Sequence, residues 1–453
     1  MTETSRNSLN RDTCGSHPLG KGLRPSFHAL WHLPEGRLGV VKDLTHFESA
    51  DWEEASTADK PVRVAIIDTP IAHDHPNLQG AIDLGLMRDF SLSPAGAFVL
   101  PRLDPTDFPD DDESRQNLKT TIEQKNLENE PLGKRILAEI HGPDTDPPHI
   151  IPGAHGTALA GLIGARPARV CLRKPDYHEI DKRCSIVGAQ ELPYCGINPF
   201  CRIVPISIGA GPDPDMLAGA LDYAYLIDAD IVVIADSWDR PDDWHRHDGW
   251  RRVETVFLKL CRQSRVFCAA GNEPADALVY PAALARKPGK DVRDTGPWAV
   301  GACTLDGKDL SYSPNWQAIN GNGHRMIRTL STEHSRYDRE VGARLDPWEI
   351  VDEELGRPPG DPDFPPHDII STDVPGPAGY NPSVYDHTPG AGGEHYEIAS
   401  LYCRFSGTSA ATAIAAGLVS LAMQSGKSPG QGRADPGATL FDLGTAARLV
   451  CHY

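Results

Sequence analysis

Three short apolar runs place the strongest limit on how this chain folds. They span residues 62–68, 231–235 and 266–270, and each is almost continuously apolar. Apolar side chains at helical spacing lie between the first two, at residues 216–225. Buried strands that alternate with helices are typical of an open α/β fold whose strands run parallel. In such folds, functional residues gather at the carboxyl ends of the strands.

The charge of the chain argues against two classes of partner. It carries 44 Lys and Arg against 63 Asp and Glu, a formal net charge of −19. Nucleic acid and anionic lipid both attract basic surfaces, so we expect neither nucleic acid nor a membrane as a partner. The longest apolar run, residues 410–423, is shorter than the roughly 20 residues that span a bilayer. We therefore expect it to form a buried core helix.

The N-terminus and the cysteines indicate the compartment. The first residues contain no apolar segment of the kind found in secretory signal peptides. The ten cysteines show no C-x-x-C spacing, so free thiols in a reducing compartment are the expected state. A zinc site among Cys171, Cys184, Cys195 and Cys201 is the alternative. We expect a cytoplasmic protein.

Four polar residues lie where such a fold builds functional sites. Asp68 ends the first apolar run, and His155 opens a helix of small residues. Asn272 follows the third run in a turn next to a glycine, and Ser409 lies at the mouth of the apolar helix. A carboxylate, an imidazole and a hydroxyl are the groups of nucleophilic catalysis, and an amide can bind an oxyanion. Taken singly, each also has an ordinary structural interpretation as a turn, core or capping residue.

The order of these residues along the chain resembles that of the subtilisin-like serine proteases, or subtilases. Further segments are similar to the family in the same order, at residues 74–78, 220–232, 280–283, 298–302 and 368–372. The resemblance implies an α/β fold of three layers, with a mostly parallel central sheet flanked by helices and extended by surface insertions. It also implies that this chain is a serine endopeptidase.

The resemblance assigns a role to each of the four residues. Ser409 is the nucleophile that forms an acyl-enzyme, and His155 is the base that takes its proton. Asp68 orients His155, and the Asn272 side chain binds the oxyanion together with the Ser409 N–H. The resemblance also implies a set of substrate-binding residues, which comprises Ser237, Trp238, Asp239, Ala270 and Gly271. Carboxylates near this set, at Asp236 and Asp239, favour Arg or Lys before the scissile bond, although ordinary surface charge explains them equally well.

The chain also departs from the family pattern. Pro70 replaces a Gly that usually follows the Asp-Thr pair, Ala158 replaces a second His, and Ala413 replaces a Pro in the nucleophile helix. None of these changes removes a catalytic atom. Asn77 stands where many members have a calcium-binding Asp, so the structural calcium site is left open. The chemistry itself requires no cofactor and no metal.

The chain is expected to contain one large domain with additions. Residues 1–60 form an N-terminal extension, which a short prosegment would explain, residues 61–425 form the protease domain, and residues 426–453 form a tail. Insertions are expected at about residues 101–150, 171–200, 317–367 and 376–396. The acidic segment 101–150 lies between Asp68 and His155, so we interpret it as a lid or a docking surface for a regulatory protein.

These features predict a regulated intracellular protease that acts on protein or peptide substrates. Two alternatives remain at this point. One is a catalytically impaired subtilase-fold protein that binds peptides without cutting them. The other is a metal-dependent hydrolase that uses His73, Asp74 and His75 together with Asp68, because His-x-His pairs bind zinc.

Overall fold

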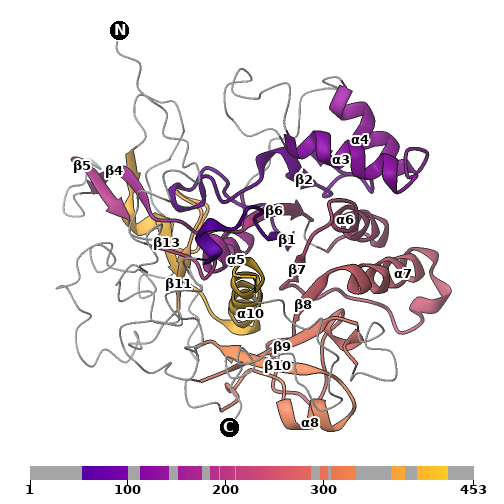
Figure 1. The fold of residues 1–453 in the computed structure, drawn as a ribbon. Coiled ribbons are helices and arrows are strands. Elements are labelled where there is room, and N and C mark those ends of the chain that lie inside the picture. Colours follow the sequence, from indigo (N-terminus) through magenta and orange to yellow (C-terminus); the bar gives the residue numbers. More distant parts are fainter. Residues whose placement is uncertain are drawn as a thin grey trace.

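An eight-stranded sheet forms the centre of the computed structural model (Figure 1), with the strand order β10-β9-β8-β7-β1-β6-β2-β3. Every neighbouring pair is parallel except β2 and β3 at one edge. The predicted α/β class with a mostly parallel sheet is therefore confirmed. The structure describes residues 54–99, 113–141, 152–175, 184–192, 194–209, 211–286, 296–304, 308–332, 369–382 and 395–426.

The strands of the central sheet agree with the apolar runs of the sequence. They are β1 (Arg63–Asp68), β2 (Arg88–Asp89), β3 (Ala97–Phe98), β6 (Arg202–Ser207), β7 (Ile231–Ile234), β8 (Arg265–Ala269), β9 (Trp298–Cys303) and β10 (Met326–Leu330). The three runs used to predict the fold are β1, β7 and β8. Because side chains alternate along a strand, Val64 and Ile66 of β1 enter one core, and Ala65 and Ile67 enter the other.

Helices cover both faces of the sheet and complete three layers (Figure 1). One face carries α5 (Ala154–Gly164) and α10 (Gly407–Gln424), and the other carries α6 (Pro214–Leu226) and α7 (Asp248–Gln263). The helix α10 is 94% buried inside the protein, which confirms the expected core helix. Its small Ala, Gly and Ser side chains allow it to be surrounded on all sides.

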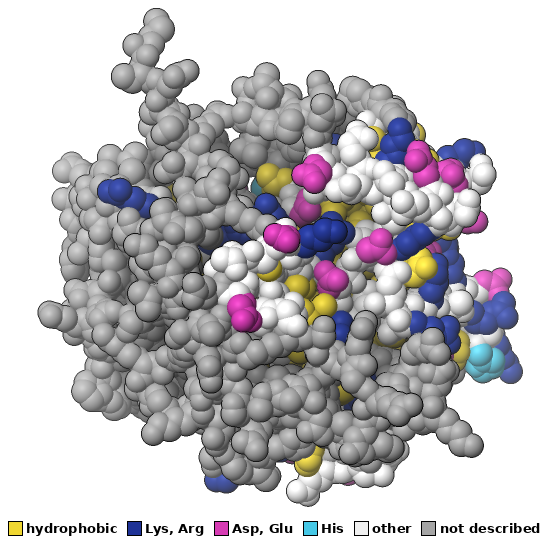
Figure 2. Space-filling view, viewed as in Figure 1, with side chains coloured by type: hydrophobic (Ala, Val, Ile, Leu, Met, Phe, Trp, Pro, Cys, Tyr) yellow, Lys and Arg dark blue, Asp and Glu magenta, His cyan; other side chains and the backbone are white. Residues whose placement is uncertain are grey.

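Two further helices, α3 (Glu113–Gln124) and α4 (Pro131–His141), lie in the predicted insertion 101–150. They bury Leu118, Ile122, Leu132 and Ile136 in the same core as α6. The fully buried Arg88 of β2 forms an ion pair with Glu139 of α4 at 2.7 Å. The described part of this insertion is therefore docked as part of the α6 layer, which does not fit the lid interpretation. Over these helices, acidic and basic side chains are interspersed (Figure 2).

Smaller elements complete the described fold. A second sheet joins β12 (His395–Glu397), β4 (Ala168–Pro175) and β5 (Cys184–Leu192), and a third pairs β11 (Ile370–Thr372) with β13 (Tyr402–Arg404). The helix α8 is Trp316–Gly321. The short 3-10 helices are η4 (Pro76–Leu78), η5 (Leu84–Leu86), η7 (Trp244–Arg246), η8 (Ala282–Leu284) and η11 (Ile398–Leu401).

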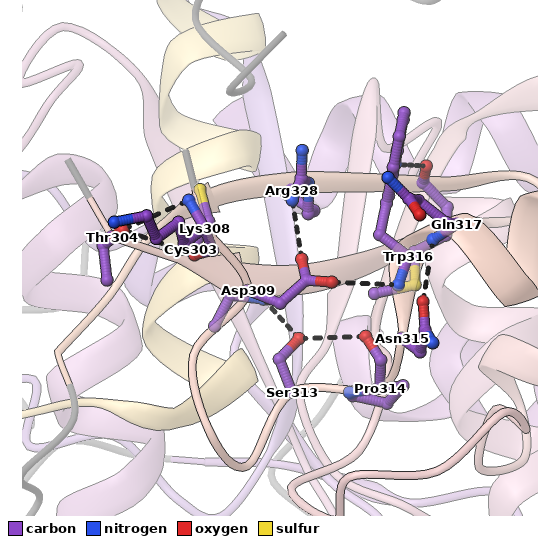
Figure 3. Close-up of polar contacts among 12 residues, drawn as sticks. Cys303, Thr304, Lys308, Asp309, Ser313, Pro314, Asn315, Trp316, Gln317 and Arg328 are labelled. Carbon is purple, nitrogen blue, oxygen red and sulfur yellow. Dashed lines mark hydrogen bonds and ion pairs between the residues drawn. The ribbon is translucent and has the colours of Figure 1, made fainter. Parts of the chain in front are cut away.

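Two of the predicted insertions begin or end inside the core. The predicted insertion 317–367 includes β10, which is the edge strand of the central sheet. The polar residues of this segment indicated a surface insertion, but Arg328 has a partner within the fold. It pairs with Asp309 at 2.7 Å, and Asp309 also accepts the Trp316 N–H at 3.3 Å (Figure 3). The predicted insertion 171–200 ends with residues 194–200, which are buried throughout. These two boundaries were wrong.

The cysteines are mostly buried thiols. No disulfide bond is formed by Cys195, Cys201, Cys261, Cys268 or Cys403, as expected. Burial raises the pKa of the Cys201 thiol to about 11, so this group is unreactive. Cys303 is disulfide-bonded, which corrects the expectation of free thiols at that position. Most of the predicted N-terminal extension and C-terminal tail lies outside the described residues.

Candidate active site

The Asp68 carboxylate and the His155 imidazole form a close pair at the carboxyl end of β1. Both Asp68 oxygens lie near His155 Nδ1, at 2.9 and 3.0 Å. Because a carboxylate only accepts hydrogen bonds, Nδ1 carries the proton and Nε2 keeps a lone pair. Asp68 is 2% exposed, whereas the His155 side chain is 26% exposed and so remains accessible.

The charge of this pair sets the pKa of His155. Burial lowers the pKa of the imidazole, but the Asp68 carboxylate, its hydrogen bond and the Asp236 carboxylate together raise it above the ordinary value of 6.5. Asp236 is exposed and lies two residues after the end of β7. An imidazole with these neighbours is stabilised in its charged form, which is the form that a general base reaches during the reaction.

Close packing between α5 and the end of β1 brings the pair together. The Gly156 N–H donates to Thr69 Oγ1 at 3.0 Å, and the Thr69 hydroxyl donates to Asp68 Oδ1 at 3.1 Å. A Cβ at Gly156 would lie 2.3 Å from the Thr69 carbonyl oxygen. Only glycine therefore permits this approach, and it places His155 within reach of Asp68.

Ser409 lies in the first turn of α10, on the same side of the sheet as α5. The residue is 6% exposed, and its hydroxyl donates to the Ala235 carbonyl, just after β7, at 3.1 Å. Within the described ranges, no hydrogen bond joins the Ser409 hydroxyl to His155. The Ser409 N–H lies among the first amides of α10, which have no partner within the helix and can bind an anion.

Asn272 is held against the same turn. Its Oδ1 accepts the Thr408 N–H at 2.8 Å and lies 3.0 Å from Thr408 Oγ1. Because an N–H can only donate, the side-chain oxygen must face Thr408, and among the described residues Nδ2 has no hydrogen-bond partner. Gly407 has φ +79°, and a Cβ there would lie 3.2 Å from the Asn272 amide. The glycine lets the amide reach the nucleophile turn.

Comparison with known protein families identifies the family of this chain. A model of the Subtilase family matches residues 59–435. The chain belongs to the subtilase family. The resemblance seen in the sequence is thereby confirmed, and the family is one of serine peptidases. Comparison with the curated proteins finds no match.

Several solved structures of proteases resemble this subtilase. The prenylagaramide maturation protease PagA is 17% identical, with 83% of this chain and 80% of that chain covered at a TM-score of 0.39. The epidermin leader peptide processing serine protease EpiP from Staphylococcus aureus is 13% identical, with 86% and 71% covered at a TM-score of 0.45. The nisin leader peptidase NisP from Lactococcus lactis is 13% identical, with 81% and 78% covered at a TM-score of 0.42.

The predicted substrate-binding residues of this subtilase fall into two groups. Ser237 and Asp239 are exposed, and Gly271 has φ +112° in the turn before Asn272. Trp238 is 4% exposed, and its N–H and carbonyl bond to Tyr280 and Arg240. Ala270 is likewise buried, with its N–H and carbonyl bonded to Val300 and Val279.

The structure therefore brings together only part of the predicted substrate-binding segment. Ala235, which the sequence did not single out, is the residue of this segment that contacts Ser409. Ala235 lies two residues before Ser237, where the predicted substrate-binding segment begins. The apolar run that forms β7 gave no signal for this, because the sequence does not show where the strand meets α10.

The calcium site that the family suggests does not fit the residues around Asn77. Asn77 Nδ2 lies 2.8, 3.3 and 3.2 Å from the carbonyl oxygens of Arg166, Leu192 and Tyr194. Its Oδ1 accepts the Tyr402 hydroxyl at 2.6 Å. The amide nitrogen thus occupies the position among three carbonyl oxygens that a cation would take. We assign no calcium to Asn77.

The zinc pair of the metal-hydrolase alternative is also disfavoured. The fully buried His75 ring donates from Nε2 to the Leu401 carbonyl at 2.8 Å. Its Nδ1 accepts the Asn77 N–H at 3.1 Å. Both ring nitrogens are therefore used within the fold, and neither has a lone pair for a metal.

Proposed function

We propose that this subtilase is a serine endopeptidase that uses Asp68, His155 and Ser409. The single observation that carries the proposal is the Asp68–His155 contact of 2.9 Å. It lies beside the start of α10, where Ser409 is found, because the His155 ring packs 5.5 Å from the ring of Phe405. A buried carboxylate that fixes one imidazole nitrogen leaves the other nitrogen ready to accept a proton. An endopeptidase of this kind acts on a protein or peptide substrate.

The mechanism begins with rotation of the Ser409 side chain away from Ala235. His155 Nε2 takes the hydroxyl proton while Ser409 Oγ attacks the peptide carbonyl carbon. The proton then passes to the leaving amine, and the acyl-enzyme remains. Water repeats the sequence in reverse, giving the free carboxylic acid and restoring the Ser409 hydroxyl. Asp68 stabilises the charged imidazole in both steps.

Two donors are available for the oxyanion that forms during attack. They are the Ser409 N–H at the start of α10 and Asn272 Nδ2, which binds no other group in the described part of the chain. Donors of this kind act where charge develops and are already aligned before the reaction. Loss of one such donor costs about 10²–10³ in rate, a magnitude known from a subtilisin.

We also propose a preference for Arg or Lys before the scissile bond. Asp236 and Asp239 are exposed and lie within four residues of Ala235, which contacts the nucleophile. A carboxylate at this point attracts a cationic side chain. The cytoplasmic location and the control by a regulatory protein stay predictions, as they rest on the sequence alone.

A fluorophosphonate probe tests the proposed function, because it reacts only with an activated serine. We expect the wild type to be labelled with a single mass increment and Ser409→Ala to remain unlabelled. The observed bond from Ser409 to Ala235 makes a peptide-binding protein without activity the second candidate. Equal absence of label in both proteins, with retained peptide binding, would establish that second candidate instead.

A further inference from the structure

One peptide unit in the nucleophile turn is held from both sides. This unit joins Gly407 to Thr408, immediately before Ser409. Its N–H donates to Asn272 Oδ1 at 2.8 Å. Its carbonyl oxygen accepts the Ser331 hydroxyl at 3.0 Å. The two bonds together fix the plane of the peptide, because any rotation about the chain direction would break at least one of them.

Ser331 is itself held in one orientation. It follows β10 at 5% exposure, and its N–H donates to the Cys303 carbonyl at 3.1 Å. Because its single hydroxyl proton is given to Gly407, its oxygen is left to accept hydrogen bonds. The Tyr312 hydroxyl lies 2.9 Å from Ser331 Oγ and 2.9 Å from the Thr332 carbonyl oxygen, so these two acceptors share its single proton.

We propose that Ser331 is a positioning residue for the oxyanion site and that Tyr312 holds its hydroxyl in place. This inference rests on the proposed function of Asn272 and Ser409. Both oxyanion donors depend on the Gly407–Thr408 peptide: Asn272 through its bond to the Thr408 N–H, and the Ser409 N–H through the chain. Ser331 therefore aligns the two donors without touching the substrate.

The reason that alignment matters is the way an oxyanion site works. Its donors lower the barrier only if they already point at the oxygen when negative charge develops. A peptide plane free to tilt would move both donors, and small misplacements in a catalytic site are costly. Loss of the Ser331 hydroxyl should therefore reduce kcat, while KM, which reflects binding of the uncharged ground state, should change little.

A matched control lies in β10, two residues before Ser331. Thr329 of β10 is fully buried, and its hydroxyl also donates to a carbonyl of α10, that of Ala411, at 2.7 Å. Ala411 lies beyond the Gly407–Thr408 peptide. Thr329→Val thus deletes a comparable buried bond between the same two elements, and it leaves the peptide next to the nucleophile untouched.

The experiment measures hydrolysis of a chromogenic peptide by the full-length chain, with melting temperatures in parallel. We expect Ser331→Ala to lower kcat by about tenfold at nearly constant KM. Thr329→Val should lower the melting temperature about as much as Ser331→Ala does, but leave kcat near the wild-type value. Ser331→Ala with wild-type kcat, or equal losses of kcat in both variants, would overturn the inference.

A double-mutant cycle separates positioning from a general structural effect. In the Asn272→Ala background one of the two donors is already absent, so Ser331→Ala should cost about threefold or less. An unchanged tenfold cost in that background would contradict the role of Ser331. Should Ser331→Ala fail to fold, Tyr312→Phe provides the same test with a smaller loss of kcat, and no loss would overturn the inference.

The outcome for the wild type keeps this inference distinct from the proposed function. An active wild type with an unaffected Ser331→Ala variant removes the positioning role alone. A wild type that neither hydrolyses peptide nor reacts with a fluorophosphonate removes the proposed function, and the positioning role with it.

Discussion

His155 shows how one side chain takes its chemistry from its neighbours. Its sequence position indicates only a histidine near the start of a helix, which is an ordinary structural position. The Asp68 carboxylate decides which ring nitrogen carries the proton and raises the pKa of the imidazole against the effect of burial. Asp236 adds a second negative charge from the segment after β7. The function of the residue thus depends on two carboxylates that are distant in sequence.

The pH dependence of the reaction provides a test at this scale. His155 must be neutral to accept a proton, so a raised pKa keeps the enzyme inactive up to a higher pH. Replacing Asp236 by Asn removes a charge that raises this pKa. We therefore expect Asp236→Asn to move the acidic limb of the kcat/KM profile to lower pH, with the plateau retained.

The substrate for this measurement should carry an uncharged residue before the scissile bond, which separates the effect from substrate preference. Asp239→Asn is the matched control, because Asp239 lies on the same segment but is not among the charges that act on His155. Equal shifts in the two variants would show that the Asp236 charge has no specific effect on His155.

At the scale of elements, the two helices that carry His155 and Ser409 share one property. Both α5 and α10 consist largely of Gly, Ala, Ser and Thr, so backbone can approach backbone closely. The sequence predicts both helices, since their apolar content is clear. It does not predict that α5 must touch the turn after β1, because the contact partner of Gly156 is remote in the chain.

Substitution of Gly156 tests the importance of this approach. Alanine is intrinsically better than glycine in a helix by about 1 kcal/mol. At Gly156, however, the new Cβ would collide with the Thr69 carbonyl oxygen. We expect Gly156→Ala to lower the free energy of unfolding by about 1–3 kcal/mol and to slow peptide hydrolysis, because α5 must move away from Asp68.

Gly321→Ala in α8 is the control for Gly156→Ala. A Cβ at Gly321 would meet no atom within 4 Å, so only the gain in helix propensity applies. Thermal unfolding should therefore shift in opposite directions in the two variants. A stabilised Gly156→Ala variant would show that α5 can accommodate a Cβ next to the Thr69 carbonyl without a steric clash.

At the scale of the whole molecule, the side chain of Asn77 joins parts of the chain that are far apart in sequence. Its amide bonds to carbonyls of Arg166, Leu192 and Tyr194, and it accepts the Tyr402 hydroxyl. One neutral side chain therefore links η4, the end of α5, the end of β5 and the start of β13. In many relatives an acidic residue and calcium would be expected at this position.

Replacement of Asn77 by Asp tests whether the amide stands in place of a cation. One carboxylate oxygen would keep the Tyr402 hydroxyl as its donor, but the other would face three carbonyl oxygens, none of which can donate. We expect Asn77→Asp to lower the free energy of unfolding by about 3–5 kcal/mol at neutral pH, the usual cost of an unpaired buried charge. Chemical denaturation with and without added calcium measures the effect and any rescue by the ion.

Asn315→Asp is the control, because it makes the same chemical change at a position where the side chain only accepts hydrogen bonds. The Asn315 side chain accepts the N–H groups of Gln317 and Ala318 at the start of α8, and Asp caps helices as well as Asn does. Its stability should stay close to that of the wild type. If Asn77→Asp is as stable as this control in the absence of calcium, the idea that the Asn77 amide takes the place of a cation is refuted.

The sequence alone determined the layer architecture and the identity of the candidate catalytic residues. Buried parallel strands have a simple pattern, so β1, β7 and β8 were predicted within a residue or two of their observed ends. The strand β10 was missed because Arg328 and Thr329 are polar, and their partners Asp309 and α10 are remote in the chain.

Only the tertiary structure decided how these residues act together. Residues that meet in space from separate elements leave no pattern in the chain, because the sequence encodes local periodicity and not distance between elements. The contact of Ala235 with Ser409, the bond from Ser331 to Gly407 and the amide of Asn77 among three carbonyls all belong to this class. They exist only once the helices are packed on the sheet.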